Sequence, residues 1–194
     1  LSRLTLFLAT DVATDCRIGY YLSINKAPNQ YDLLSLFKNI FSIWKPLNLK
    51  TPGLIYIPGS GFTSGLSEEF CNIGLNMVRL DNAFCHIAHT VRDYVCNELG
   101  ATISLGLPAK PKMRNLIEFA FRILNYDMHR FPSTTGSHPK DPIKETSKNS
   151  KKPPIITLNA LEEVLSVIIS GHNAKPQNKL GGSSPLGLMK FHMA

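Results

Sequence analysis

The sequence predicts an α/β domain, and three observations lead to that class. Short apolar runs rich in β-branched and aromatic residues alternate with longer segments in which apolar residues recur every three or four positions. The chain has 194 residues, 43% of them hydrophobic and 18% charged, which is a globular composition and enough to bury a core without disulfides. Two strands come first, and helices and strands alternate after them, so we expect a mixed sheet with helices on its faces.

The predicted strands are four short apolar runs. Residues 4–10 and 17–24 (RIGYYLSI) are separated by a polar segment at 11–16, so this pair predicts a β-hairpin. Two further strands are predicted at 77–81 (MVRLD) and 101–105 (ATISL). No apolar run approaches the roughly 20 residues of a membrane-spanning helix.

Four segments carry the apolar spacing of a helical face. In the second of them, Val91 and Val95 are expected to face inward, and in the last, Thr157 is expected to cap the first turn. The segments are 31–44, which Pro46 ends, 87–99, 111–126, and the stretch after Thr157 that contains Leu161, Val164, Leu165, Ile168 and Ile169.

Polar and Pro-rich stretches separate these elements. Residues 46–76 are predicted to form a loop with at most one short strand near Ile55 and a short helix near residues 66–74. We expect residues 1–129 to form the main body of a core domain, residues 130–156 to be a basic, Pro-rich linker, and residues 157–194 to add a C-terminal helix and an extended tail.

Charge and cysteine content restrict the function only loosely. Lys and Arg exceed Asp and Glu by 21 to 14, which favours a polyanionic partner but is shared by many soluble proteins. The four cysteines form no C-x-x-C pair, so they are expected to be free thiols in a reducing compartment such as the cytoplasm. The spacing of Cys85, His86, His89 and Cys96 is not that of a zinc site.

Two acids stand where a catalytic site would need them. Asp81 ends a predicted strand, and ligands collect at the carboxyl ends of strands in α/β sheets. Glu118 lies at the edge of the apolar stripe of the 111–126 helix. If the two carboxylates converge, they need a hard divalent cation such as Mg²⁺ or Mn²⁺. On local sequence alone, Asp81 is equally well explained as a helix N-cap, and a Glu placed like Glu118 is usually a solvated side chain.

Several strings, in order along the chain, resemble the catalytic core of the DD(E) transposases and integrases of the retroviral integrase superfamily. RLDNA and RNLIE, with 36 residues between Asp81 and Glu118, resemble the segments that carry the family's second and third acids. The nearest resemblance is to the Mu-like bacterial transposases. The other strings that carry it are TLFLATDVATDCRIGYYLSI, LGATISLGLPAKPKMRNLIE, HRFPSTTGS, ITLNALEEVL and GGSSPLG.

This resemblance implies a ribonuclease-H-like fold and metal-dependent phosphoryl transfer on DNA. It implies that Asp81 and Glu118 are catalytic carboxylates and ligands of two Mg²⁺ or Mn²⁺ ions. These ions would activate a water that nicks an element end, and then the freed 3′-hydroxyl that joins this end to a target. Double-stranded DNA would be the partner, and the full-length protein would be a homo-oligomer without a membrane anchor. A bacterial protein of this kind would work in the cytoplasm at the nucleoid.

One departure from the family pattern concerns the first acid. The family's fold opens with three antiparallel strands and carries its first catalytic Asp on the first of them, whereas two strands precede the first helix here. Asp11 matches a later acid of the family. We therefore expect the first strand and first Asp to lie upstream of Leu1, and the purified chain to be nearly inactive. The alternative is that Asp11 is itself the first ligand.

Predicted DNA contacts gather before the Glu118 helix. Lys110, Lys112 and Arg114 are placed to bind phosphates, unless they form an ordinary exposed basic turn. The basic stretch 138–152 would either follow DNA or serve as a solvated linker. Tyr20, Tyr21 and Trp44 are expected to pack in the core.

Two other functions are compatible with the sequence. The chain could be a non-catalytic DNA-binding remnant that assembles with a full-length transposase. A ribonuclease-H-like nuclease unrelated to transposition is the third hypothesis, and the strings outside the predicted metal site count against it.

Overall fold

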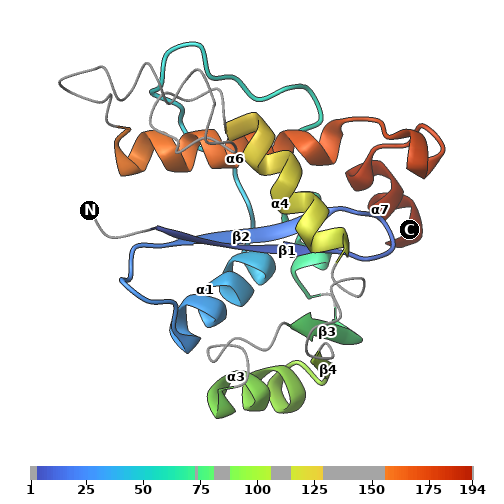
Figure 1. The fold of residues 1–194 in the computed structure, drawn as a ribbon. Helices are drawn as coiled ribbons and strands as arrows, with labels where there is room; N and C mark the ends of the chain where they lie inside the picture. The colour runs from blue at the N-terminus through green and yellow to red at the C-terminus, as the bar shows by residue number, and fades with distance from the viewer. Residues whose placement is uncertain (1–3, 73, 81–87, 106–114, 129–155, 194) are drawn as a thin grey trace.

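Two short sheets, the first of them covered on both faces by helices, form the framework of the structure (Figure 1). The computed structural model describes residues 4–72, 74–80, 88–105, 115–128 and 156–193. Strands and helices alternate after an opening hairpin, so the predicted α/β class is confirmed. Antiparallel and parallel pairing both occur, but in two separate two-stranded sheets within the described ranges.

The first sheet is the predicted hairpin. Strand β1 (Thr5–Thr10) pairs antiparallel with β2 (Arg17–Ser23), and a register shift lies between Ala9 and Thr10. Side chains alternate across the sheet as the period of a strand requires. Phe7 and Ala9 therefore face one hydrophobic core, whereas Leu6 and Leu8 face another.

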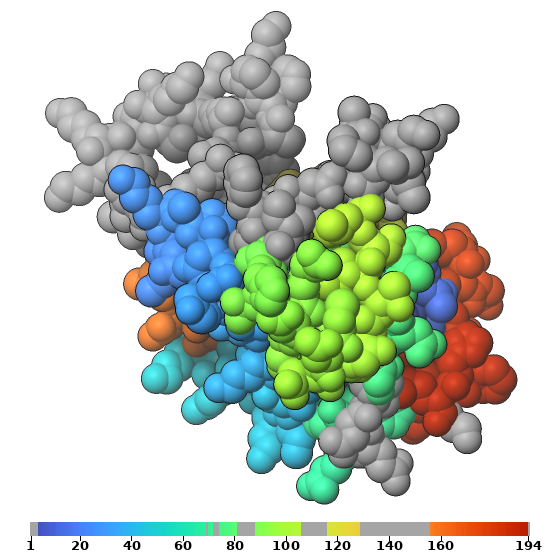
Figure 2. All heavy atoms as spheres, turned by 90° about the horizontal axis from the view of Figure 1, so that it is seen from below, coloured from blue at the N-terminus to red at the C-terminus, as the bar shows by residue number. Residues whose placement is uncertain are grey.

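The first core lies between this sheet, α1 (Gln30–Phe41) and α3 (His89–Asp93). Helix α1 approaches β2 so closely that a Cβ added to Gly19 would lie 2.7 Å from Ile40 Cγ1. Figure 2 shows the green segment that contains α3 lying beside blue α1 on one face of the molecule. The buried residues of the first core are Phe7, Leu33, Leu36, Phe37, Ile40, Val91, Val95 and Ala101.

The second core lies on the opposite face of the hairpin, under α4 (Asn115–Met128) and α6 (Leu158–Ala174). Figure 1 shows α4 crossing above β1 and β2 on the side away from α1. Thr157 caps α6 as predicted, because its hydroxyl accepts a hydrogen bond from Ala160 N at 3.2 Å. The residues that pack here include Phe62, Leu124, Leu165 and Ile169, with Leu6, Leu8, Tyr20, Leu22, Trp44, Phe121 and Met128 at the margin.

The second sheet pairs β3 (Met77–Leu80) with β4 (Thr102–Leu105) in parallel. A parallel pair needs a crossover, and α3 followed by a π-helical turn at Tyr94–Glu98 supplies it. Val91 and Val95 face inward as predicted, both fully buried. Leu80 pairs with Leu105, so both strands end at the same edge.

Short helical turns occupy much of the remaining described chain. No strand occurs in the described part of the 46–76 segment, which contains the 3₁₀ turns Thr63–Gly65 and Glu68–Asn72. Glu163 on α6 anchors this loop by accepting hydrogen bonds from Thr51 N at 2.8 Å and Lys50 N at 3.1 Å. None of the helices in the described ranges combines the length and apolar content needed to cross a bilayer.

Two predictions about element ends were wrong. Helix α1 ends at Phe41, so Trp44 is not on its apolar face; Trp44 instead packs against Phe62 with ring centroids 5.5 Å apart. The extended tail is absent, because residues after α6 form a 3₁₀ turn (Asn178–Leu180) and helix α7 (Pro185–Met193). Pro185 begins α7, a position where its missing N–H costs nothing.

Candidate functional site

Of the five residues predicted to act on DNA or metal, the structure describes Glu118. It lies in the first turn of α4 and its side chain is exposed. Asp81, Lys110, Lys112 and Arg114 lie outside the described residues. The predicted convergence of Asp81 and Glu118 therefore stays a prediction.

The backbone around these positions has one informative feature. β3 and β4 run parallel and end in register at Leu80 and Leu105. Asp81 follows β3 directly in the sequence, and α4 is the next described element after β4. In α/β sheets, loops that leave the carboxyl ends of parallel strands gather ligands. A site built by these loops would therefore lie at the sheet edge where the strands end at Leu80 and Leu105.

A divalent metal ion needs several protein ligands, so Glu118 by itself does not make a metal site. Within the described ranges, no group of three His, Cys, Asp or Glu side chains is close enough to hold an ion. No side-chain hydrogen bond or ion pair between described residues involves the Glu118 carboxylate. Its exposed carboxylate has the oxygen chemistry that Mg²⁺ prefers, so Glu118 fits the role of one ligand among several.

Asp11, the alternative first ligand, has a role in the hairpin turn. Its Oδ2 accepts hydrogen bonds from Thr14 N at 2.8 Å and Thr14 Oγ1 at 2.7 Å. A side-chain acceptor of this kind satisfies backbone N–H groups where the chain reverses. The geometry accounts for an Asp at position 11 without any metal.

A buried charged cluster follows directly in the same turn. Asp15 is 3% exposed and has a left-handed backbone, with φ at 57°. Its Oδ1 accepts from Arg17 NH1 at 2.9 Å, and its Oδ2 accepts from Lys179 Nζ at 2.6 Å. The His172 ring lies 3.3 Å from the same Oδ2. We call Asp15, Arg17, His172 and Lys179 the Asp15 cluster.

Electrostatics in the Asp15 cluster favour the ionised carboxylate. Burial raises the pKa of Asp15, but the hydrogen bonds from His172 and Lys179, together with the charges of Arg17 and Lys179, outweigh it and hold the pKa well below its usual range. Arg17 itself is 3% exposed, and its NH2 has no hydrogen-bond partner among the described residues. The buried Arg17 guanidinium therefore depends on Asp15 for its counter-charge.

The Asn173 side chain connects the backbone of Arg17, a member of the cluster, to the backbone of Gly61. Its side-chain oxygen accepts from Arg17 N at 2.7 Å, and its amide donates to Arg17 O at 2.8 Å and Gly61 O at 2.7 Å. It is fully buried, so these three bonds are made away from water. Strand β2, helix α6 and the loop at Gly61 are thereby joined at one residue.

Lys179 links the Asp15 cluster to the helix that carries Glu118. Its Nζ lies 5.4 Å from the ring centroid of Phe119, in a cation–π arrangement. Phe119 follows Glu118 in α4 and is 42% exposed. The C-terminal segment thus contacts the first turns of α4 directly.

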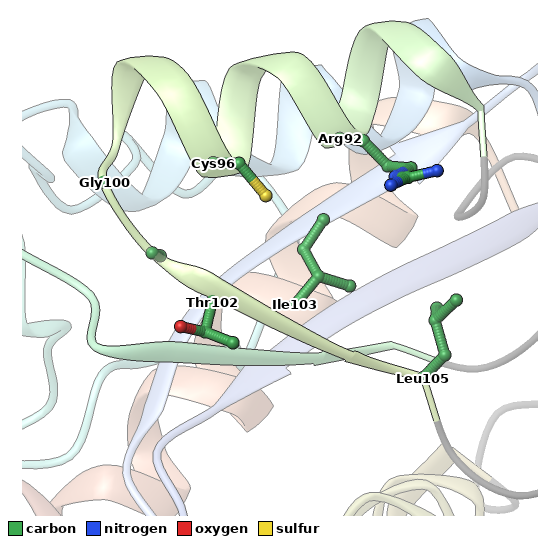
Figure 3. Close-up of a pocket in the computed structure, with 7 residues that line it drawn as sticks. Arg92, Cys96, Gly100, Thr102, Ile103 and Leu105 are labelled. Carbon is green, nitrogen blue, oxygen red and sulfur yellow. The ribbon is translucent and has the colours of Figure 1, made fainter.

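A separate cavity lies away from these residues. It has a volume of about 610 Å³ and lies between α3, the π-helical turn and β4 (Figure 3). Arg92 and Cys96 on the helical side face the strand residues across it. No carboxylate lines it, so its chemistry is not that of the predicted metal site. The lining residues are Arg92, Cys96, Gly100, Ala101, Thr102, Ile103 and Leu105.

Sequence reasoning did not identify the Asp15 cluster. Asp15 and Arg17 lie inside a string that carries the resemblance, but only as part of the hairpin. The cluster is completed by His172 and Lys179, and Asn173 binds the backbone of Arg17. All three residues are more than 150 positions away, and no spacing rule connects them to the hairpin. The available signal was the pair of charged residues, Asp15 and Arg17, at the turn of an otherwise apolar hairpin.

Comparisons with known proteins give a modest structural similarity. No family model matches the chain, and no curated protein matches it. A crystal structure of the catalytic core domain of BIV integrase is similar to it, with a TM-score of 0.45 and 15% identity over 97% of this chain and 88% of that chain. A similarity at this level does not assign the chain to a family.

Proposed function

We propose that this chain is part of the catalytic core of a DNA transposase or integrase with a ribonuclease-H-like fold. The observation that carries the proposal is the arrangement around the two predicted acids. Asp81 directly follows one strand of a parallel pair, and Glu118 is exposed in the first turn of the helix after the other strand. The strings RLDNA and RNLIE, which resemble the family's acid-bearing segments, coincide with those two places.

In this proposal the chain's own residues hold the reactants and the ions perform the activation. Asp81 and Glu118 bind divalent cations, and Lys110, Lys112 and Arg114 bind backbone phosphates of double-stranded DNA. Two bound Mg²⁺ ions would supply the activation of a water or 3′-hydroxyl and the stabilisation of the leaving oxygen. No side chain is required as a covalent nucleophile.

Metal binding by the purified chain tests the proposal. We expect Mn²⁺ to bind, and both Asp81→Asn and Glu118→Gln to weaken its affinity by at least about tenfold, because each removes a ligand. Glu98→Gln is the matched control, since Glu98 is exposed on the π-helical turn. Titration followed by the electron paramagnetic resonance of free Mn²⁺ measures the affinity. Equal affinity in all four proteins would refute the metal site.

DNA binding supplies a second test that is independent of metal. Replacing Lys110, Lys112 and Arg114 together by Ala should lower the slope of log affinity against log salt by about 3, because each of the three cations is expected to neutralise one phosphate. Fluorescence anisotropy with duplex DNA at several salt concentrations measures the slope. DNA binding combined with no effect of Glu118→Gln on Mn²⁺ would instead identify a non-catalytic DNA-binding protein.

A further inference from the structure

The first turn of α4 belongs to neither hydrophobic core of the described residues, although Leu116 and Ile117 in it are half-buried. The α4 residues that pack in the second core are Phe121, Leu124 and Met128, and Ala120 is buried beside them. All of these lie after Glu118 and Phe119. Contacts outside the two cores therefore contribute to holding the turn that carries Glu118.

Lys179 is placed to hold it. Figure 1 shows the β1–β2 turn, one end of α4 and the C-terminal segment meeting at one side of the molecule. Lys179 Nζ lies there, 2.6 Å from Asp15 Oδ2 and 5.4 Å from the centroid of the Phe119 ring. The ammonium thus connects a buried carboxylate to an aromatic ring one residue away from Glu118.

The backbone around Lys179 is itself fixed. Leu180 N and Gly182 N donate to Gln177 O at 3.0 and 3.1 Å, and Gln177 N donates to Ser183 O at 3.0 Å. Gly181 and Gly182 have φ values of 62° and 83°, which glycine adopts without strain. Because this turn is closed by its own hydrogen bonds, the Lys179 side chain projects from a defined place.

We propose that Lys179 is a positioning residue for Glu118: anchored on Asp15, it holds Phe119 and so fixes the first turn of α4. The inference rests on the proposed function for the role of Glu118, but the positioning itself is a property of the described structure. Phe119 is 42% exposed, and the Lys179 ammonium lies over its ring.

Hydrogen exchange measured by mass spectrometry tests the positioning without metal. Lys179→Met should raise the exchange rate of amides 116–119 by about fivefold, the effect expected from removing one cation–π interaction, and leave amides 122–126 unchanged. Lys179→Arg should restore wild-type rates, because Arg also pairs with a carboxylate and stacks on a ring. Lys175→Met is the matched control, since Lys175 is an exposed lysine at the end of α6.

A second variant covers the case in which Lys179→Met disturbs the Asp15 cluster. Phe119→Leu leaves the Asp15–Lys179 pair intact and should produce the same local increase in exchange. The inference is overturned if either variant exchanges like Lys175→Met, or if exchange rises equally along the whole of α4.

Mn²⁺ titration then separates this inference from the proposed function. If Glu118 binds the ion, Lys179→Met should weaken Mn²⁺ affinity by about tenfold, as removal of a group that supports a ligand does. If Glu118→Gln leaves Mn²⁺ affinity unchanged, the proposed function fails, and the exchange rates alone decide whether Lys179 positions α4.

Discussion

The thiol of Cys16 illustrates how strongly a single residue's surroundings set its chemistry. Cys16 is fully buried in the hairpin turn, and burial, together with the negative charges of Asp11 and Asp15, raises its pKa to about 12. At about pH 8 it is therefore a protonated, inaccessible thiol. Cys96, by contrast, is a free cysteine exposed on the π-helical turn.

Alkylation with iodoacetamide should separate the two cysteines. We expect Cys96 to be modified quickly in the folded protein, and Cys16 only after denaturation, because only the former offers an accessible sulfur. Peptide mass spectrometry over a time course measures both rates in one sample. Modification of Cys16 at the rate of Cys96 in native buffer would contradict the buried placement.

Asp15 should make the protein sensitive to acid. Its pKa is depressed in the folded state, so its contribution to stability is complete above the unfolded value of about 4 and is lost as pH falls below it. His172, Arg17 and Lys179 are the charged or titratable groups that face it.

Urea unfolding at a series of pH values measures this contribution. Asp15→Asn should lower the free energy of unfolding near neutral pH by about 3 kcal/mol, since it leaves the Arg17 guanidinium buried without a counter-charge. The difference between wild type and variant should shrink as pH falls below about 4. A difference that is constant over the whole range would show that the Asp15 charge is not what stabilises the turn.

At the scale of elements, helices with dense apolar spacing were the most predictable. The last long helix and its Thr157 cap, the hairpin, and the inward valines of α3 all follow from local pattern. Helix α7 was not predictable in this way, because the Gly- and Ser-rich stretch before it resembles a tail and the helix begins at a proline, Pro185. Trp44 fitted the helical period of α1 by coincidence, since the helix ends three residues earlier.

The contact between β2 and α1 gives a test at this scale. Gly19→Ala should destabilise the protein by about 1–3 kcal/mol, because its Cβ would lie 2.7 Å from Ile40 Cγ1 and a packed core resists overpacking. Gly74→Ala is the control, since a Cβ there meets nothing within 4 Å. Chemical denaturation measures both; equal stabilities would mean that α1 moves away from β2 without cost.

For the molecule as a whole, Asn173 is the residue that joins separate parts. Asn173→Ala would leave the backbone N–H and C=O of Arg17 and the C=O of Gly61 without partners in a buried place. We expect a loss of about 2–4 kcal/mol in unfolding free energy, from denaturation curves. Asn39→Ala, which removes an exposed bond to Tyr20 O, should cost less than about 1 kcal/mol. If both variants lose a similar amount of unfolding free energy, the buried hydrogen bonds of Asn173 contribute little to stability.

The candidate site was predictable only in its local parts. The strand before Asp81 and the helix of Glu118 follow from short-range patterns, and the structure has both elements. The Asp15 cluster is not visible in the sequence, because its partners meet only when α6 and the turn after it pack on the hairpin.

The long separation between Arg17 and Asn173 also affects biosynthesis. The hairpin leaves the ribosome before α6, because the residue that satisfies the Arg17 backbone lies 156 positions later. At roughly 5–20 residues per second, that distance corresponds to about eight to thirty seconds of translation. Throughout this interval Leu6, Leu8, Tyr20 and Leu22 lack the complete α6, one of the two helices that cover them in the finished protein. A nascent chain with such an uncovered apolar face is a natural client for ribosome-associated chaperones.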